Sequence, residues 1–100
     1  MPEKKSNRGK IEIMADILSL STAGIKKTHI MYRANLSYEQ ILYYLNELMA
    51  KSLISLHVRD GSALYTTTEK GREFLKCYAY MAQLIGDGQA PSQGVELLVS

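Results

Sequence analysis

The stretch that decides the fold runs from Lys26 to Ile54 and reads K-K-T-H-I-M-Y-R-A-N-L-S-Y-E-Q-I-L-Y-Y-L-N-E-L-M-A-K-S-L-I. It predicts two helices, over residues 27–34 and 38–51, joined by a tight turn around Asn35. Asparagine tolerates the left-handed backbone conformation that such a turn needs. The two helices are therefore expected to pack closely against each other.

The helix over residues 38–51 separates apolar from polar side chains. Ser37 and Gln40, three residues apart, form a capping-box pattern that marks where this helix begins. At 100° per residue, one arc is apolar and is expected to be buried, while the opposite arc is expected to face solvent. The apolar arc holds Ile41, Leu42, Leu45, Leu48 and Met49, and the opposite arc holds Glu39, Gln40, Tyr43, Asn46, Glu47 and Ala50.

A β-hairpin is predicted directly after these helices. Ile54, Leu56 and Val58 alternate with polar residues, which indicates a half-buried strand. Asp60-Gly61 is a strong signal for a two-residue hairpin turn, and residues 63–67 form the returning strand. Two helices followed by such a hairpin predict a helix-turn-helix with a wing, a shape that fits the major groove of DNA.

Two further helices complete the pattern. Residues 10–20 repeat apolar side chains at helical spacing and are expected to lie centrally in the core. Thr68 is a candidate N-cap for a helix over residues 69–85, and Thr28 is a candidate N-cap for the helix over residues 27–34. The order helix-helix-helix-strand-strand-helix predicts an α+β, mainly α fold, a winged helix-turn-helix with a C-terminal dimerisation helix. The seam expected to pair this last helix with a second copy consists of Phe74, Tyr78, Met81 and Ile85.

The charge of the chain is unevenly distributed. The formal net charge is only +2, which by itself is weak support for nucleic-acid binding. Residues 1–35 carry seven Lys or Arg against three acidic residues, whereas residues 36–100 carry five against seven. Positive charge therefore gathers on the N-terminal arm and at the start of the helix-turn-helix.

The composition excludes several kinds of site. A single cysteine, Cys77, rules out an intramolecular disulfide and a multi-cysteine zinc site, and it is expected to be a small buried residue. No run of about 18 apolar residues indicates a membrane span, and the basic N-terminus does not look like a signal peptide. His29 and His57 lack metal-ligand spacing, and no catalytic motif stands out. We therefore expect no enzyme activity, metal, cofactor or small-molecule ligand.

Three motifs within residues 10–85 match a known family. They are T-H-I-M-Y-R-A-N-L-S-Y-E-Q (Thr28 to Gln40), L-x-x-L-M-x-K-x-L-I (Leu45 to Ile54) and T-E-K-G-R-E-F-L (Thr68 to Leu75). Through them the chain resembles the small archaeal winged-helix DNA-binding proteins, which include abundant chromatin-associated members. The resemblance implies a homodimer joined by an antiparallel coiled coil of C-terminal helices, DNA binding by the third helix and the wing, and no cofactor. Many members carry glycine where this chain has Ser52, so a left-handed backbone there carries a conformational cost.

The candidate DNA-binding residues each have a simpler structural explanation. Gln40 can read adenine, and Ser37 and Tyr43 can contact phosphate; the alternative is a solvated helix face with a capping residue. The residues at the second helix and its lead-in can form a phosphate clamp, and the alternative is that their basic side chains serve only solubility. At the wing tip, a minor-groove contact by Arg59 competes with an exposed strand-end side chain. The full candidate set is Lys26, Lys27, Thr28, Arg33, Ser37, Gln40, Tyr43 and Arg59.

The leading interpretation is a dimeric protein that binds double-stranded DNA in the cytoplasm as part of the nucleoid, either as a transcription regulator or as a weakly sequence-selective chromatin protein. The alternative is a winged-helix protein–protein interaction module, which the low net charge and the outward-facing Glu47 favour. A pair between Glu47 and Lys51 at i, i+4 would neutralise that acid. The expected parts are a flexible basic arm (1–9), a winged-helix domain (10–68), the dimerisation helix (69–85) and a flexible tail (86–100).

Overall fold

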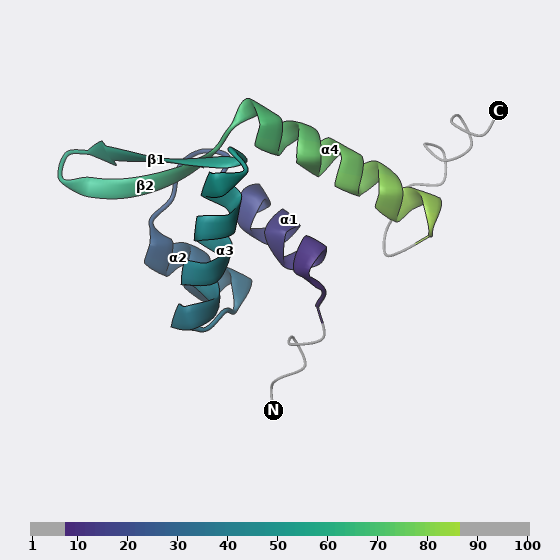
Figure 1. Ribbon diagram of the computed structural model, residues 1–100, viewed down its shortest axis with the longest axis horizontal. Helices are drawn as coiled ribbons and strands as arrows, with labels where there is room; N and C mark the ends of the chain where they lie inside the picture. The colour runs from purple at the N-terminus through teal and green to yellow at the C-terminus, as the bar shows by residue number, and fades with distance from the viewer. Residues whose placement is uncertain (1–7, 87–100) are drawn as a thin grey trace.

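The computed structural model describes residues 8–86, which form four helices and one antiparallel hairpin (Figure 1). The predicted order of elements is confirmed, and the helices predicted to reach residues 51 and 85 each end one residue earlier. Most of the predicted arm and nearly all of the predicted tail lie outside the described residues. The elements are α1 (Lys10–Leu20), α2 (Lys27–Ala34), α3 (Tyr38–Ala50), β1 (Ile54–Arg59), β2 (Ser62–Thr67) and α4 (Glu69–Leu84).

Side-chain caps define where α3 and α4 begin. Ser37 Oγ accepts a hydrogen bond from the Gln40 amide at 3.1 Å, while Gln40 Oε1 accepts one from the Ser37 amide at 2.9 Å. This is the capping box that the sequence predicts. Thr68 Oγ1 accepts the Gly71 amide at 3.1 Å, so its prediction as the cap of α4 is also confirmed.

The α2 boundaries agree with the sequence at one end only. Asn35 has φ 57°, so the left-handed turn predicted before α3 is confirmed. The predicted N-cap at Thr28 is wrong, because the extended residue that precedes the helix is Lys26 and Thr28 already lies in its first turn. Within α2, Ile30 faces inward and is completely buried.

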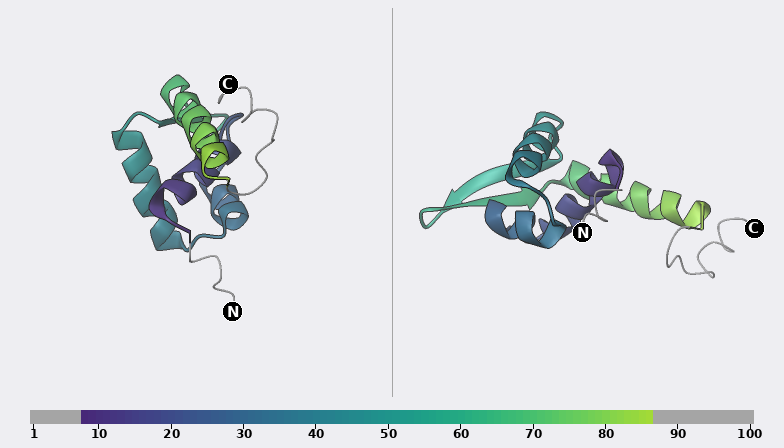
Figure 2. Two further views of the ribbon diagram at one scale, coloured as in Figure 1. Left: turned by 90° about the vertical axis from the view of Figure 1, so that its right-hand side faces the viewer. Right: turned by 90° about the horizontal axis from the view of Figure 1, so that it is seen from below.

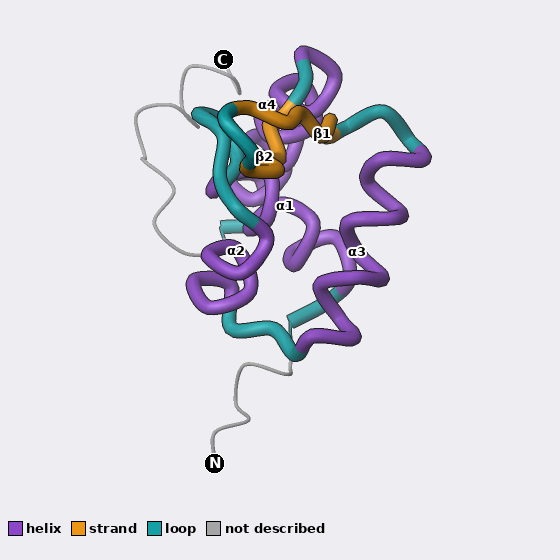
Figure 3. Tube along the Cα trace, turned by 90° about the vertical axis from the view of Figure 1, so that its left-hand side faces the viewer, coloured by secondary structure: helices purple, strands orange, loops and turns teal. Residues whose placement is uncertain are grey.

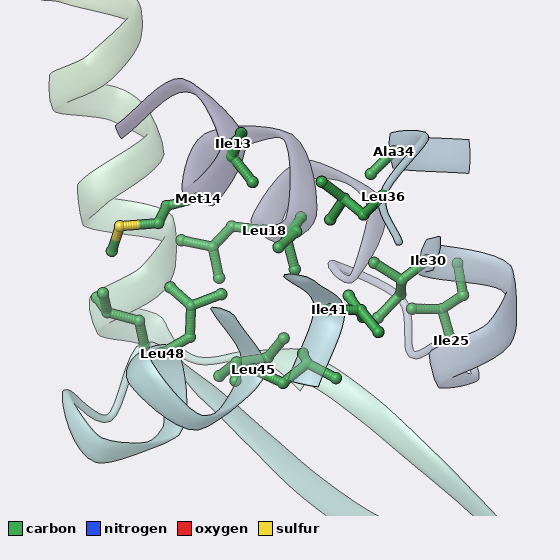
Figure 4. Packing of buried hydrophobic residues seen from close by; sticks show 13 residues of the cluster. Ile13, Met14, Leu18, Ile25, Ile30, Ala34, Leu36, Ile41, Leu45 and Leu48 are labelled. Atoms are coloured by element: carbon green, nitrogen blue, oxygen red, sulfur yellow. The ribbon is translucent and has the colours of Figure 1, made fainter. Parts of the chain in front are cut away.

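The hydrophobic core fills the space between α1, α2 and α3 (Figure 4). Leu18 of α1, Ile30 of α2 and Ile41 of α3 are completely buried, and the close view shows their side chains turned toward a common centre. Burying a side chain of this kind stabilises a fold by about 1.5–3 kcal/mol. The core therefore holds α2 and α3 in a defined arrangement around α1.

Three apolar residues that the sequence pattern placed on buried faces are exposed. Leu42 is 37% exposed, because α3 buries a narrower arc than the pattern suggests. Leu56 is 43% exposed and Val58 75%, since β1 extends beyond the helices and only Ile54 at its base is well covered (Figure 1). The predicted burial of Leu42 and the predicted half-burial of the strand were wrong at these positions.

The hairpin forms a wing that extends away from the helical body. Arg59 pairs with Ser62, so the chain reverses over Asp60 and Gly61, with φ angles of 51° and 76°. Two positive φ angles are typical of the type I′ turn that Asp-Gly favours, and the hairpin prediction is confirmed. The wing and α4 extend in opposite directions from the body (Figure 2).

The start of α4 packs closely on the segment that leaves α3. The Thr68 amide donates to the Leu53 carbonyl at 3.0 Å, and Thr68 Oγ1 donates to the Ser52 carbonyl at 2.7 Å. Ser52 has φ 61°, so this non-glycine residue takes the left-handed backbone whose conformational cost was anticipated from the sequence. A Cβ at Gly71 would overlap the Leu53 carbonyl oxygen and Thr67 Cγ2. Only glycine permits this approach.

Replacing Gly71 with alanine tests this close packing. Alanine favours helix over glycine by about 1 kcal/mol, so an open helical site would be stabilised. Here we expect Gly71→Ala to lower the free energy of unfolding by about 1–3 kcal/mol, the usual cost of overpacking. Chemical denaturation measures the change. Gly9→Ala is the control, because its new Cβ has no neighbour within 4 Å. Stabilisation by Gly71→Ala would contradict the packing.

Candidate nucleic-acid interface

The helix α3 lies beside α2 and beneath the wing, and its outward face points away from the core. Figure 3, viewed from the wing side, shows α2 and α3 next to each other with the hairpin above them. Burial of the opposite arc of α3 leaves Glu39, Tyr43 and Asn46 exposed. A helix held by its core with a polar outer face has the shape needed to enter a major groove.

Two candidate reading residues already have structural partners. Ser37 and Gln40 form the capping box, so both side chains accept hydrogen bonds from backbone amides of their own helix start. A bidentate contact to adenine uses both ends of a glutamine amide. Gln40 therefore has to give up its cap before it can read a base in this way, whereas Asn46, on the outward face, is not part of the cap.

The start of α2 brings positive charge close to α3. Lys26 and Thr28 are exposed, and Lys27 Nζ lies 5.3 Å from the centre of the Tyr38 ring in the first turn of α3. This distance is typical of a cation–π interaction, which favours Arg or Lys over the face of an aromatic ring. Three sequence candidates thus lie together at the edge of the outward face.

The structure does not place Arg33 or Arg59 in this group. Arg33 lines a shallow pocket with Asp16 and Ser19, on the side of α2 that faces α1. Arg59 is exposed at the end of β1, next to the wing turn. A basic side chain at a wing tip is positioned for a groove beside the one that α3 would occupy, so Arg59 remains a candidate at a separate contact point.

The flank of α3 that faces α1 carries a network of charged groups. Lys51 Nζ lies 3.0 Å from Glu47 Oε1, which confirms the predicted i, i+4 pair. Lys10 Nζ lies 3.8 Å from the same oxygen and donates a hydrogen bond to Tyr43 Oη at 3.2 Å. The contact between Lys10 and α3 could not be predicted from local sequence patterns, because it joins residues 33 positions apart.

These contacts shift two pKa values in the directions that pairing favours. The hydrogen bond from Lys51, followed by its positive charge, lowers the pKa of Glu47 below its ordinary value. The hydrogen bond to Tyr43 is the main cause that raises the pKa of Lys10. Both groups therefore keep their charges at neutral pH, and the acid on this face is matched by nearby cations.

Arg8 ties the residues that lead into α1 to the turn between α2 and α3. One guanidinium nitrogen lies 2.6 Å from Asp16 Oδ2, and another donates to the Ala34 carbonyl at 2.6 Å. Carbonyl groups at a helix end lack partners within the helix, and a cation there is favourable. The chain therefore enters α1 close to the start of α3.

Neither a metal site nor a membrane-spanning helix is present in the part of the chain that the structure describes. Between residues 8 and 86, no three His, Cys, Asp or Glu side chains come together in a way that could hold a metal ion. In the same part of the chain, no helix combines the length and apolar character needed to cross a membrane.

Several solved structures share this fold. Sso10a-2, a DNA-binding protein from Sulfolobus solfataricus, matches with a TM-score of 0.72 and 24% identity over 93% of this chain and 98% of its own. BpsR from Bordetella bronchiseptica, whose DNA binding is regulated by 6-hydroxynicotinic acid, gives 0.64 and 14% over 98% and 75%. A MarR-family transcriptional regulator from Silicibacter pomeroyi gives 0.58 and 19% over 96% and 69%. At such identities, these matches show the fold alone.

Sequence comparison identifies the family. No curated protein sequence matches this chain. The model of the winged helix-turn-helix family, however, matches residues 7–86, which include every helix and strand described above. The chain therefore belongs to the winged helix-turn-helix family.

Proposed function

We propose that this protein is a dimer that binds double-stranded DNA in the cytoplasm as part of the nucleoid. We also propose that it is related to the small archaeal winged-helix DNA-binding proteins. It serves either as a transcription regulator or as a weakly sequence-selective chromatin protein. The observation that carries the proposal is the exposed polar face of α3 beside the basic start of α2. The shared fold with Sso10a-2, itself a DNA-binding protein, supports it.

In this proposal, α2 supplies phosphate contacts and α3 enters the major groove. Lys26 and Lys27 are exposed or half-exposed beside the first turn of α3, where they can approach a phosphate backbone. Tyr43 and Asn46 face outward, and asparagine can read adenine through two hydrogen bonds. Arg59 provides a minor-groove contact from the wing. Few base-reading groups beside several cations favour weak sequence selectivity.

The proposed dimer uses the uncovered apolar side of α4. Met81 is 49% exposed, Leu84 53% and Ile85 72%, so this end of the helix presents a broad apolar surface. Phe74 and Tyr78, the other two residues of the predicted seam, are only half-exposed. Cys77 is exposed, so the expectation from the sequence that it is a buried residue is wrong.

A second copy of the same helix is the partner that best fits this surface. Apolar side chains repeated on one side of a helix are typical of helix pairing between protomers. An apolar groove between α1 and α4, with Ile11, Phe74 and Cys77 among its lining residues, continues the surface toward the body. The proposed parts of the chain are the arm (1–9), the winged-helix domain (10–68), the dimerisation helix (69–85) and the tail (86–100).

A binding titration tests the DNA interface. We expect the protein to bind a mixed-sequence duplex at low salt, and log K to fall linearly with log salt concentration. Lys27→Ala should weaken binding and reduce the salt slope by about 0.9 per protomer, the value for one lost phosphate contact. Lys76→Ala, with the same charge change on α4, should leave the slope unchanged. Fluorescence anisotropy measures both.

The outcomes of this titration separate two readings of the fold. Absence of binding by the wild-type protein at low salt would overturn the proposal and favour the protein–protein interaction module. Equal effects of Lys27→Ala and Lys76→Ala would show that binding is not directed to α2 and α3.

Light scattering tests the dimer. The chain has a mass of 11.2 kDa, and we expect the wild-type protein to show twice this value. Met81→Glu places a charge on the apolar surface and should produce monomers with unchanged helical content, because Met81 is half-exposed in the protomer. Lys76→Glu is the control on the same helix and should remain dimeric. A dimeric Met81→Glu variant, or a monomeric wild type, would refute the assignment.

A further inference from the structure

One carboxylate on α3 is shared by two lysines from different parts of the chain. Glu47 Oε1 lies 3.0 Å from Lys51 Nζ at the end of α3 and 3.8 Å from Lys10 Nζ at the start of α1. Lys10 is further held by its hydrogen bond to Tyr43 Oη and lies 5.5 Å from the centre of that ring. Two cations are thus gathered around one acid, next to a residue of the outward face.

Folding stability does not explain this arrangement. The Glu47 side chain is 31% exposed, and those of Lys10 and Lys51 are 50% and 51% exposed. Ion pairs at such positions contribute little to the stability of a fold, because water and salt screen them. The network instead determines which charges the α1 side of α3 presents to an approaching polyanion.

The network lies opposite the basic start of α2. Lys27 contacts Tyr38 at one edge of the outward face of α3, whereas Lys10 contacts Tyr43 at the other edge. A helix in the major groove has a phosphate backbone on each side, so cations on both flanks of the face can each meet a strand. The flank that carries Lys10 is occupied by an acid, whereas no carboxylate within residues 8–86 forms an ion pair with Lys27.

We propose that Lys10 and Lys51 form a second phosphate-binding site on the α1 side of α3, and that Glu47 occupies this site when DNA is absent. The inference rests on the proposed DNA-binding function. When DNA binds, a phosphate oxygen replaces the Glu47 carboxylate as the partner of the two lysines. Because the ion pairs of Glu47 have to be broken first, the net free energy of binding to any duplex is less favourable. Glu47 therefore limits affinity for DNA in general. Because the pKa of Glu47 is lowered by Lys51, the carboxylate stays charged throughout the neutral range.

The decisive variant is Glu47→Gln, which keeps the shape of the side chain and removes its charge. Affinity for a mixed-sequence duplex should rise by roughly fivefold to twentyfold, since two exposed ion pairs no longer have to be broken. The salt slope should steepen by up to about 0.9 per protomer for each lysine released. Circular dichroism should remain unchanged, and the melting temperature should fall by only a few degrees, because the same ion pairs make a small contribution to folding.

A second background shows whether Glu47 acts through the lysines. In a Lys10→Met/Lys51→Met protein, Glu47→Gln should raise affinity only by relief of direct repulsion, and so by a smaller factor than in the wild-type background, because no phosphate-binding site remains to be released. Glu39→Gln is the matched control: it removes an acid from the same exposed helix, and its effect by relief of direct repulsion should be equal in both backgrounds.

The results distinguish this inference from the proposed function. If neither the wild type nor Glu47→Gln binds the duplex, both fail. If the wild type binds and Glu47→Gln changes neither affinity nor salt slope, only the second phosphate site is refuted. It is equally refuted if Glu47→Gln raises affinity by the same factor with and without the two lysines, because Glu47 would then act by simple repulsion.

Discussion

The burial of one side of α3 is the constraint on which the rest of the structure depends. Ile41, Leu45 and Leu48 are almost fully enclosed by α1 and α2, so the helix cannot rotate about its axis without exposing them. The same packing fixes Tyr43 and Asn46 on the outside. Just after α3, the close contact of Gly71 with Leu53 fixes where α4 begins. Shape and orientation at the surface thus follow from the core.

With the orientation of α3 fixed, the charged side chains fall on two defined flanks of its outward face. A net charge of +2 gives little attraction for DNA over long distances. Locally, the cation of Lys27 lies on one flank of α3, and the cations of Lys10 and Lys51 lie around Glu47 on the other. Glu47, the acidic residue that counted against nucleic-acid binding in the sequence, forms ion pairs with Lys10 and Lys51 in the structure. Its presence on the face is compatible with DNA binding and gives a means of limiting affinity.

Local signals in the sequence were sufficient for the elements and their order. The capping box at Ser37, the left-handed turn at Asn35 and the Asp60-Gly61 hairpin each depend on residues within a few positions of one another, and all three are present. Burial depends on what other elements cover, which explains the errors at Leu42 and Val58.

The candidate site was less predictable than the fold for the same reason. Composition located the basic residues but could not show that Arg33 faces α1. Contacts such as that of Lys10 with Tyr43 arise only when distant segments pack together. The types of side chain in the sequence therefore indicated nucleic acid as the class of partner, whereas the tertiary structure shows which of these side chains are placed to contact it.

The most direct test of the central claim, that the core presents α3 and its flanks to DNA, is an NMR titration. Backbone amide shifts of ¹⁵N-labelled protein would be followed as a mixed-sequence duplex is added. We expect the largest changes at Lys27, Tyr43, Asn46 and the wing around Arg59, with α4 little affected. Changes confined to α4, or none at low salt, would contradict it.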